Sequence, residues 1–258
     1  MIVFTTLHND KYKDLADITF NNKKNYCEKH NYPLLAKTDK WYNIPMGFEK
    51  AFLIKDAFVK YPTCEWVFFS ECDTMITNMD IKLEDIIKNE DKHFVITTDI
   101  NGINAGSFFV RNSQQGKEFL QAMIYHIGKC NNEQDFILYS YFISCNYKNI
   151  ISLYPQKSFN SYDYYVFGDR YPSGLDMFGN NGRWEKGDFI IHFPDRPLQE
   201  RIDLAKKYSQ YVLGDKYPSG LNTIGNNHIW EKDEFIIHFP DKTLQERIDL
   251  ARDSLKSF

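Results

Sequence analysis

The sequence has no apolar run close to the about twenty residues that a membrane-spanning helix needs, and no charged-then-apolar leader at its start. It also lacks a basic excess: the net charge is −4 and charged residues make up 26% of the chain, which excludes a basic field for gripping nucleic acid. The five cysteines form no C-x-x-C pair and are odd in number, which favours free thiols in a reducing compartment. We therefore expect a soluble, cytoplasmic protein with no membrane span and no nucleic-acid partner.

Strand-like and helix-like patterns alternate along the 258 residues, a length that can bury one sizeable core with a small appendage. Short runs rich in aromatic and branched residues predict strands, and apolar residues at helical spacing predict helices. The predicted strands are 2–6, 34–36, 66–69 and 94–98, with another after the small residues at 101–106, and the predicted helices are 12–30, 48–61, 81–89, 115–127 and 136–142. The β-α-β opening places the chain in the α/β class.

The stretch from Glu65 to Met79 combines a buried strand with acidic residues. Its apolar strand is followed by Glu71 and Asp73, two carboxylates at positions i and i+2. On an extended chain such side chains point the same way, and here they lie at the carboxyl end of the strand, where open α/β sheets bind ligands. Two oxygen anions suit Mn²⁺ or Mg²⁺ held jointly with substrate phosphates. The alternative is a pair of solvated turn residues.

Other candidate ligand contacts are weaker when each is taken alone. Thr5 and Thr6 close the first strand, where they could meet a ligand or could simply be edge-strand residues. Lys50, near the start of a helix, could face a phosphate or solvent. The small residues at 101–106 suit close approach of a main chain to a ligand, but a plain turn has the same composition. Glu133 opens a helix, where acidic residues normally interact with the helix dipole.

The C-terminal part of the chain is duplicated. Residues 168–206 and 214–252 align without gaps at an offset of 46 and share 28 of 39 residues. Such identity indicates a recent tandem duplication, not a solenoid, which needs three or more units. Each copy predicts turns, a strand Phe-Ile-Ile-His-Phe and a helix. One copy is therefore predicted to be dispensable.

The duplication offers two histidines at equivalent strand ends, His192 and His238. Neutral imidazole joins carboxylates around Mn²⁺, although a strand-end histidine can equally be structural. We favour His192, because the first copy follows the core directly. The expected division is a catalytic domain at 1–207 and an appended tail at 208–258, which could pack on the chain or pair with another subunit in a homo-oligomer.

Several segments together match one family in order and spacing. The segments are Lys50–Lys55, Tyr61 and Pro62, Glu65–Asp73, Ile103–Asn112, Glu133 and Gln134, and Ile191–Phe193. With them the chain resembles the GT-A-fold glycosyltransferases, most closely the galactosyltransferase and xylosyltransferase family of fungal α-1,2-galactosyl- and α-1,6-mannosyltransferases and plant xyloglucan xylosyltransferases. The match spans Ile2 to Asp195 and is more specific than any single motif. It implies a GT-A-like, mostly parallel twisted sheet flanked by helices.

The resemblance also implies a nucleotide-sugar donor, usually a UDP-hexose or UDP-pentose, a divalent ion and retention at the anomeric carbon. By position, Glu71, Asp73 and a C-terminal histidine would hold the metal; Lys50, Thr5 and Thr6 would contact the nucleotide; and Asp99, Asn104, Glu133 and Gln134 would surround the sugar and acceptor.

Two departures from the family bear on the chemistry. Glu71 is one methylene longer than the usual aspartate. No glycine-cysteine-lysine follows the histidine, so the cation that steadies the diphosphate would come from Arg196, or from Lys242 in the second copy.

Three functions are compatible with these features. The leading hypothesis is a metal-dependent retaining glycosyltransferase that moves a hexose or pentose from a UDP-sugar to a glycan or other hydroxyl acceptor. A sugar-1-phosphate nucleotidyltransferase would want a Gly-rich loop after the first strand, where the sequence reads His8, Asn9, Asp10 and Lys11. The third is a catalytically inactive carbohydrate-binding or scaffold protein of the same fold.

Overall fold

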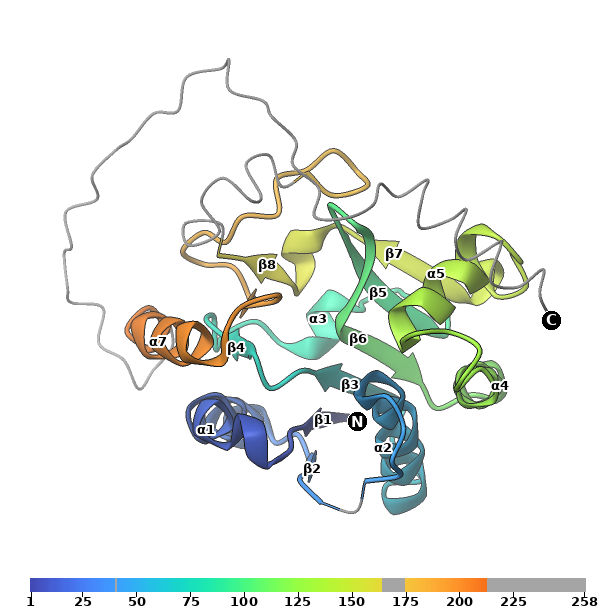
Figure 1. Cartoon of the computed structure of the whole chain (residues 1–258), viewed down its shortest axis with the longest axis horizontal. Coiled ribbons are helices and arrows are strands. Elements are labelled where there is room, and N and C mark those ends of the chain that lie inside the picture. The colour runs from blue at the N-terminus through green and yellow to red at the C-terminus, as the bar shows by residue number, and fades with distance from the viewer. Residues whose placement is uncertain (40, 164–174, 213–258) are drawn as a thin grey trace.

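A six-stranded sheet forms the centre of the computed structural model, which describes residues 1–39, 41–163 and 175–212 (Figure 1). The strand order is β2 (Leu34–Lys37), β1 (Ile2–Leu7), β3 (Trp66–Ser70), β6 (Gly102–Arg111), β5 (Phe94–Asp99) and β7 (Ile151–Tyr154). Within this sheet β6 alone is antiparallel to its neighbours. The predicted mostly parallel sheet is therefore confirmed, and the reversal at β6 makes it mixed.

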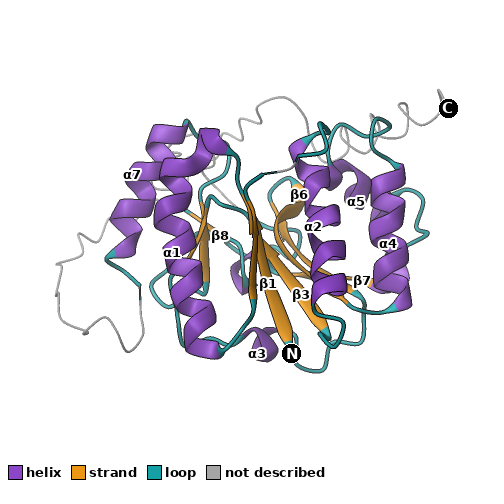
Figure 2. Cartoon of the chain, turned by 90° about the horizontal axis from the view of Figure 1, so that it is seen from below, coloured by secondary structure: helices purple, strands orange, loops and turns teal. Residues whose placement is uncertain are grey.

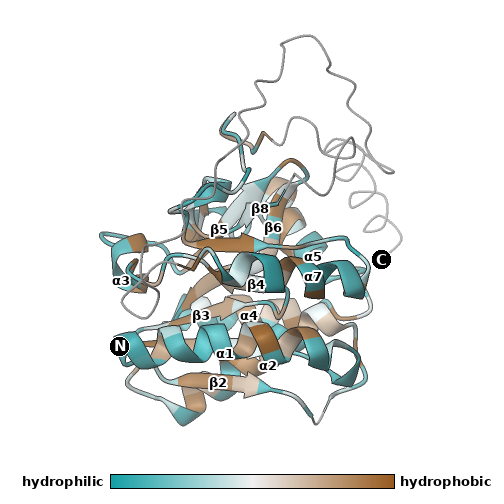
Figure 3. Cartoon of the chain, turned by 90° about the vertical axis from the view of Figure 1, so that its left-hand side faces the viewer, coloured by the Kyte–Doolittle hydropathy of each residue, from teal (hydrophilic) through white to brown (hydrophobic). Residues whose placement is uncertain are grey.

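Helices cover both faces of the sheet (Figure 2). The longer helices are α1 (Lys13–His30), α2 (Met46–Lys60), α4 (Gln114–Tyr125), α5 (Glu133–Phe142) and α7 (Leu198–Ser209), with a single turn at α3 (Leu83–Ile86) and 3-10 turns at Asp10–Tyr12, Lys148–Ile150 and Gln156–Ser158. Helices α1 and α7 pack together on one side, and α2, α4 and α5 on the other. Figure 3 shows that α1, which lies at the surface, is mostly hydrophilic.

The core has two layers because alternate residues of a strand face opposite sides of the sheet. Phe68 belongs to the cluster beneath α1 and α7, whereas its neighbour Phe69 belongs to the cluster beneath α2, α4 and α5. Phe108 and Phe109 divide in the same way on β6. The aromatic strand predicted from the sequence is thus buried on both faces.

A second, three-stranded sheet brings the C-terminal part of the chain to the end of β3. Its order is β4 (Thr74–Ile76), β9 (Ile190–His192) and β8 (Ser161–Tyr162), so the strand latest in the sequence lies in the middle. In the antiparallel pairing of β4 with β9, Thr74 is opposite His192. This pairing places the histidine one residue away from Asp73 across the sheet.

Three sequence-based expectations change locally. The helix expected at 81–89 is limited to Leu83–Ile86. The small residues expected in a loop at 101–106 mostly lie within β6, where pairing with β5 jumps from Phe108 to Asn104, so residues 105–107 form a bulge. Residues 71–73 form a turn and do not continue the strand.

The described part of the chain ends at residue 212, just beyond α7. This helix continues through Tyr208 and Ser209, and Tyr208 and Val212 are buried in the core cluster beneath it. The second repeat copy, with His238 and Lys242, lies outside the described residues. Among the helices that the structure describes, none is both long enough and apolar enough to cross a membrane.

Candidate active site

The acidic pair lies on a tight turn between β3 and β4. The Thr74 amide and hydroxyl donate to the Glu71 carbonyl, at 3.2 and 2.7 Å, and the Ser70 hydroxyl lies 2.6 Å from that of Thr74. The two carboxylates are therefore brought together by the turn that ends the aromatic strand. The sequence predicted their proximity, but on an extended chain and not on a turn.

Helix α1 supports this turn from one side. The Thr19 hydroxyl donates to the Cys72 carbonyl (2.6 Å), and the buried Lys23 ammonium donates to the Thr74 carbonyl (2.8 Å). Asn22 bonds both the amide and the carbonyl of Ile76, at 2.8 and 2.9 Å. Three polar side chains on one helix thus fix the main chain that carries the acidic pair.

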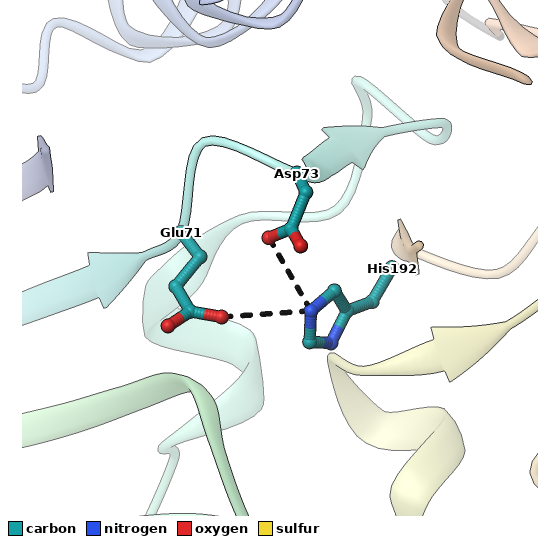
Figure 4. Close-up of side chains that lie close together, drawn as sticks. All are labelled: Glu71, Asp73 and His192. Carbon is teal, nitrogen blue, oxygen red and sulfur yellow. Dashed lines mark ion pairs between the residues drawn. The ribbon is translucent and has the colours of Figure 1, made fainter. Parts of the chain in front are cut away.

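Glu71, Asp73 and His192 form a cluster whose potential ligand atoms all lie within 4.8 Å of one another (Figure 4). His192 Nε2 is 3.5 Å from Glu71 Oε2 and 3.4 Å from Asp73 Oδ1. This buried nitrogen makes no hydrogen bond within the described part of the chain. Two carboxylate oxygens and an imidazole nitrogen facing one point are a donor set that fits Mn²⁺ or a similar divalent ion.

The charges of the cluster depend strongly on one another. Burial alone would lower the pKa of His192, but Asp73 and Glu71 raise it to about 9. Burial opposes ionisation of Glu71, yet Lys50 and His192 hold the pKa of this carboxyl well below its usual range. At neutral pH the metal-free cluster therefore has an ionised Glu71 and a protonated His192, and a bound ion would displace the proton on Nε2.

A polar pocket of about 350 Å³ opens onto this cluster. Its walls include the predicted site residues Lys50, Glu71, Asp73, Asp99, Asn104, Glu133, Gln134 and His192, together with Asn101, Ala105, Gly106, Asn132, Tyr162, Pro194, Asp195 and Arg201. The residues predicted around the metal, the sugar and the acceptor are thus brought together.

Three predicted contacts of the donor, Thr5, Thr6 and Arg196, are buried and do not line the pocket. Thr5 donates to the Phe68 carbonyl at 3.3 Å.

Lys50 joins two carboxylates in the wall of the pocket. Its ammonium lies 2.5 Å from Glu71 Oε1, 2.5 Å from Glu133 Oε1 and 2.9 Å from the Ala105 carbonyl, and the residue is 2% exposed. Burial would lower the pKa of Lys50, but Glu133 and Glu71 raise it. A Cβ on Gly47 would lie 1.4 Å from Glu133 Oε2, so glycine is needed for Glu133 to reach α2. Lys50 thus faces carboxylates in this structure.

Hydrogen bonds connect the opposite wall of the pocket. The Tyr162 hydroxyl donates to Asp99 Oδ2 (2.6 Å), and Asn104 Nδ2 donates to the same oxygen (3.0 Å). Gln134 accepts from the Ala105 amide (3.0 Å). Asp99, Asn104 and Gln134 are therefore held in fixed orientations along one side. Tyr162 was not predicted as a site residue, because a single tyrosine in an aromatic-rich segment has no distinguishing pattern.

A second cation, besides Lys50, lines the pocket: Arg201, on α7. Its Nη1 donates to Asp73 Oδ2 and its Nε donates to the Arg196 carbonyl at 2.8 Å. Arg196 instead directs Nη2 to the Asp163 carbonyl (2.9 Å), and its Nη1 lies 3.5 Å from Glu200. The sequence pointed to Arg196 because it is nearer to the histidine. Arg201 reaches the site through the packing of α7 on α1, which the local pattern does not reveal.

The chain matches proteins of known family over most of its length. A family model described as the galactosyl transferase GMA12/MNN10 family matches residues 1–90 and 86–200. A probable alpha-1,2-galactosyltransferase (gmh2) of Schizosaccharomyces pombe is 26% identical over 223 residues, covering 70% of this chain and 61% of that protein. A probable alpha-1,6-mannosyltransferase (MNN10) of Saccharomyces cerevisiae is 28% identical over 145 residues, covering 43% of this chain and 37% of that protein.

These relatives are longer than the region that matches. A solved structure of a glycosyltransferase involved in the glycosylation of the major capsid of PBCV-1 has a TM-score of 0.65 and 16% identity, covering 80% of this chain and 98% of that chain. This likeness concerns the fold alone and confirms the GT-A-like architecture expected from the sequence.

The family model, which covers well over half of the residues, confirms the resemblance. The chain belongs to the galactosyl transferase GMA12/MNN10 family.

Proposed function

We propose that the chain is a metal-dependent retaining glycosyltransferase that moves a hexose or pentose from a UDP-sugar to a glycan or other hydroxyl acceptor. The observation that carries this proposal is the cluster of Glu71, Asp73 and His192 at the floor of a polar pocket. The names of the relatives, galactosyltransferase and mannosyltransferase, support a hexose.

The main requirement of this reaction is to stabilise the negative charge that develops on the leaving diphosphate. A divalent ion held by Glu71, Asp73 and His192 would supply positive charge to the diphosphate oxygens. The Arg201 guanidinium adds to the positive potential on the same side. Asp99 and Asn104, on the opposite wall, present polar atoms to the sugar hydroxyls. Departure of the diphosphate then needs no strongly acidic side chain.

The test is isothermal titration with UDP in the presence and absence of Mn²⁺, followed by a UDP-sugar hydrolysis assay. We expect UDP binding that requires Mn²⁺ and is lost in the double variant Glu71→Gln, Asp73→Asn. Turnover of a UDP-sugar would support the transferase. Metal-dependent UDP binding without turnover over a panel of sugars and acceptors would favour the inactive binding protein, and the absence of UDP binding would refute the proposal. Release of pyrophosphate from UTP with a sugar 1-phosphate would instead identify a nucleotidyltransferase.

Arg201 is expected to stabilise the leaving diphosphate, the role that the sequence assigned to Arg196. Arg201→Ala should lower kcat by about 10²-fold, with a smaller loss for Arg201→Lys, because removal of one group that stabilises developing charge typically costs this much. The measurement is steady-state transfer at saturating Mn²⁺. Lys206→Ala, an exposed cation on the same helix, is the control and should behave as wild type. If kcat of Arg201→Ala equals that of wild type, another cation stabilises the leaving diphosphate.

A further inference from the structure

We propose that Asn160 is a positioning residue that fixes the tautomer and the ring orientation of His192. Asn160 is fully buried between the 3-10 turn at Gln156–Ser158 and β8. Its Oδ1 lies 2.8 Å from His192 Nδ1, the ring nitrogen that faces away from the carboxylates. The inference rests on the proposed metal binding by His192, and it adds a residue that the sequence did not indicate.

The Gly106 main-chain amide, which can only donate, sets the direction of the hydrogen bonds that run through Asn104 and Asn160 to His192. The Gly106 amide donates to one oxygen, Asn104 Oδ1, at 2.8 Å. That atom is therefore the amide oxygen, and it also accepts from Asn160 Nδ2 at 2.7 Å. With its nitrogen committed to Asn104, Asn160 presents its oxygen to His192.

The orientation of Asn160 determines which ring nitrogen of His192 is protonated. Because Asn160 Oδ1 can only accept, His192 Nδ1 carries the hydrogen. The lone pair of the neutral ring is then on Nε2, the atom within 3.5 Å of both carboxylates. Metal-ligating histidines commonly donate their second N–H to such a partner, which sets the tautomer and raises the basicity of the ligand.

The ring is also confined by the bulge in β6. A Cβ at Gly106 would lie 2.4 Å from His192 Cε1 and 2.9 Å from Asn104 Oδ1. The glycine thus lets the imidazole and the two amides come together. The same bonds continue from Asn104 to Asp99 and Tyr162, so Asn160 links the candidate metal ligand to the wall of the pocket.

The first experiment measures Mn²⁺ affinity without substrate, by electron paramagnetic resonance of the free ion. We expect Asn160→Ala to bind Mn²⁺ about 10- to 100-fold more weakly than wild type, and Asn160→Asp, which keeps an acceptor oxygen, to lose less. Raising Mn²⁺ should restore the activity of Asn160→Ala, and circular dichroism without Mn²⁺ shows whether the variant is folded before the ion is added. The control is Asn112→Ala, which removes bonds to the Pro62 and Cys64 carbonyls far along the sheet. Wild-type Mn²⁺ affinity in folded Asn160→Ala would overturn the inference.

A second measurement separates this inference from the proposed function. Nitrogen-15 NMR of the metal-free protein, followed as the pH is raised until the ring nitrogen shifts stop changing, reports which nitrogen of the neutral ring is protonated. We expect an Nδ1–H tautomer in wild type and its loss in Asn160→Ala. An Nε2–H tautomer in wild type would overturn the inference. If wild type shows the Nδ1–H tautomer but binds no Mn²⁺, the proposed function fails and the positioning role of Asn160 stands.

Discussion

Replacing His192 with alanine is expected to abolish Mn²⁺-dependent UDP binding and transfer, whereas replacing His238 with alanine should leave both unchanged. The two histidines stand at equivalent positions of a duplicated segment, so each substitution is the control for the other. His192 supplies the buried nitrogen between Glu71 and Asp73. Loss of one of three protein ligands from a small cation site leaves two carboxylates that hold the ion far less firmly.

The second copy has diverged where the first copy is most tightly packed. His228 corresponds to Gly182, where even a Cβ would lie 1.7 Å from the buried Gln156 side chain. Asp233 corresponds to Gly187, whose φ of +110° is strained for a residue with a side chain. Residues 214–252 therefore lack two glycines that their place in the first copy requires, which favours His192 over His238.

The measurement is Mn²⁺-dependent UDP titration of both variants, together with a chain truncated after Val212. The cut follows Val212 because Val212 is buried in the core cluster and Tyr211 packs against it. We expect the truncated chain to retain binding and activity. Activity that survives His192→Ala and disappears in His238→Ala would transfer the ligand role to the second copy.

Lys50→Met is expected to lower the free energy of unfolding by about 3–5 kcal/mol and to abolish transfer. The substitution removes the cation that lies 2.5 Å from both Glu71 and Glu133 and leaves two carboxylates facing each other in a largely buried place. Breaking a buried ion pair by removal of one partner typically costs this much, because the remaining charge is uncompensated. Lys55→Met, on the same helix with a solvent-exposed bond to Gln121, should change stability by less than about 1 kcal/mol.

Two further conditions show whether the lost charge causes the effect. Chemical denaturation in Mn²⁺ should restore part of the stability of Lys50→Met, because the ion supplies positive charge to Glu71. Adding Glu133→Gln to Lys50→Met should also restore stability, since it removes one of the two carboxylates. A Lys50→Met protein as stable as Lys55→Met, or a double variant less stable than Lys50→Met alone, would contradict the role given to Lys50.

Much of the fold and part of the site follow from local sequence patterns. The aromatic strand and the flanking helices are encoded by neighbouring residues, and the Ser113 and Asn132 side chains cap α4 and α5 through bonds to the Gly116 and Asp135 amides. Glu71 and Asp73 could be predicted because two carboxylates at positions i and i+2, directly after a buried strand, are typical of a divalent-ion site. Glu71 also extends one oxygen toward Lys50 and the other toward His192, a use for its extra methylene that only the structure shows.

The rest of the site depends on contacts between distant segments. Asn160, Tyr162 and Arg201 carry no local signal, since each becomes part of the site through packing of β8, β9 and α7 against the turn after β3. The bulge at 105–107 was missed because small residues fit a loop as well as a widened strand. Long-range pairing decides between these, and the sequence around Gly106 does not contain it.

Because β9 lies between β4 and β8, the second sheet can be completed only after β9 has been translated. β4 and β8 leave the ribosome before β9, and the gap between them is closed only when Ile190–His192 arrives. An identical Phe-Ile-Ile-His-Phe segment follows 46 residues later. Because N-terminal segments emerge first during translation, the first copy meets the gap while the second is still being made. In the nascent chain the earlier copy is therefore the first that can supply a histidine to this gap, whereas both copies are present together during refolding from denaturant.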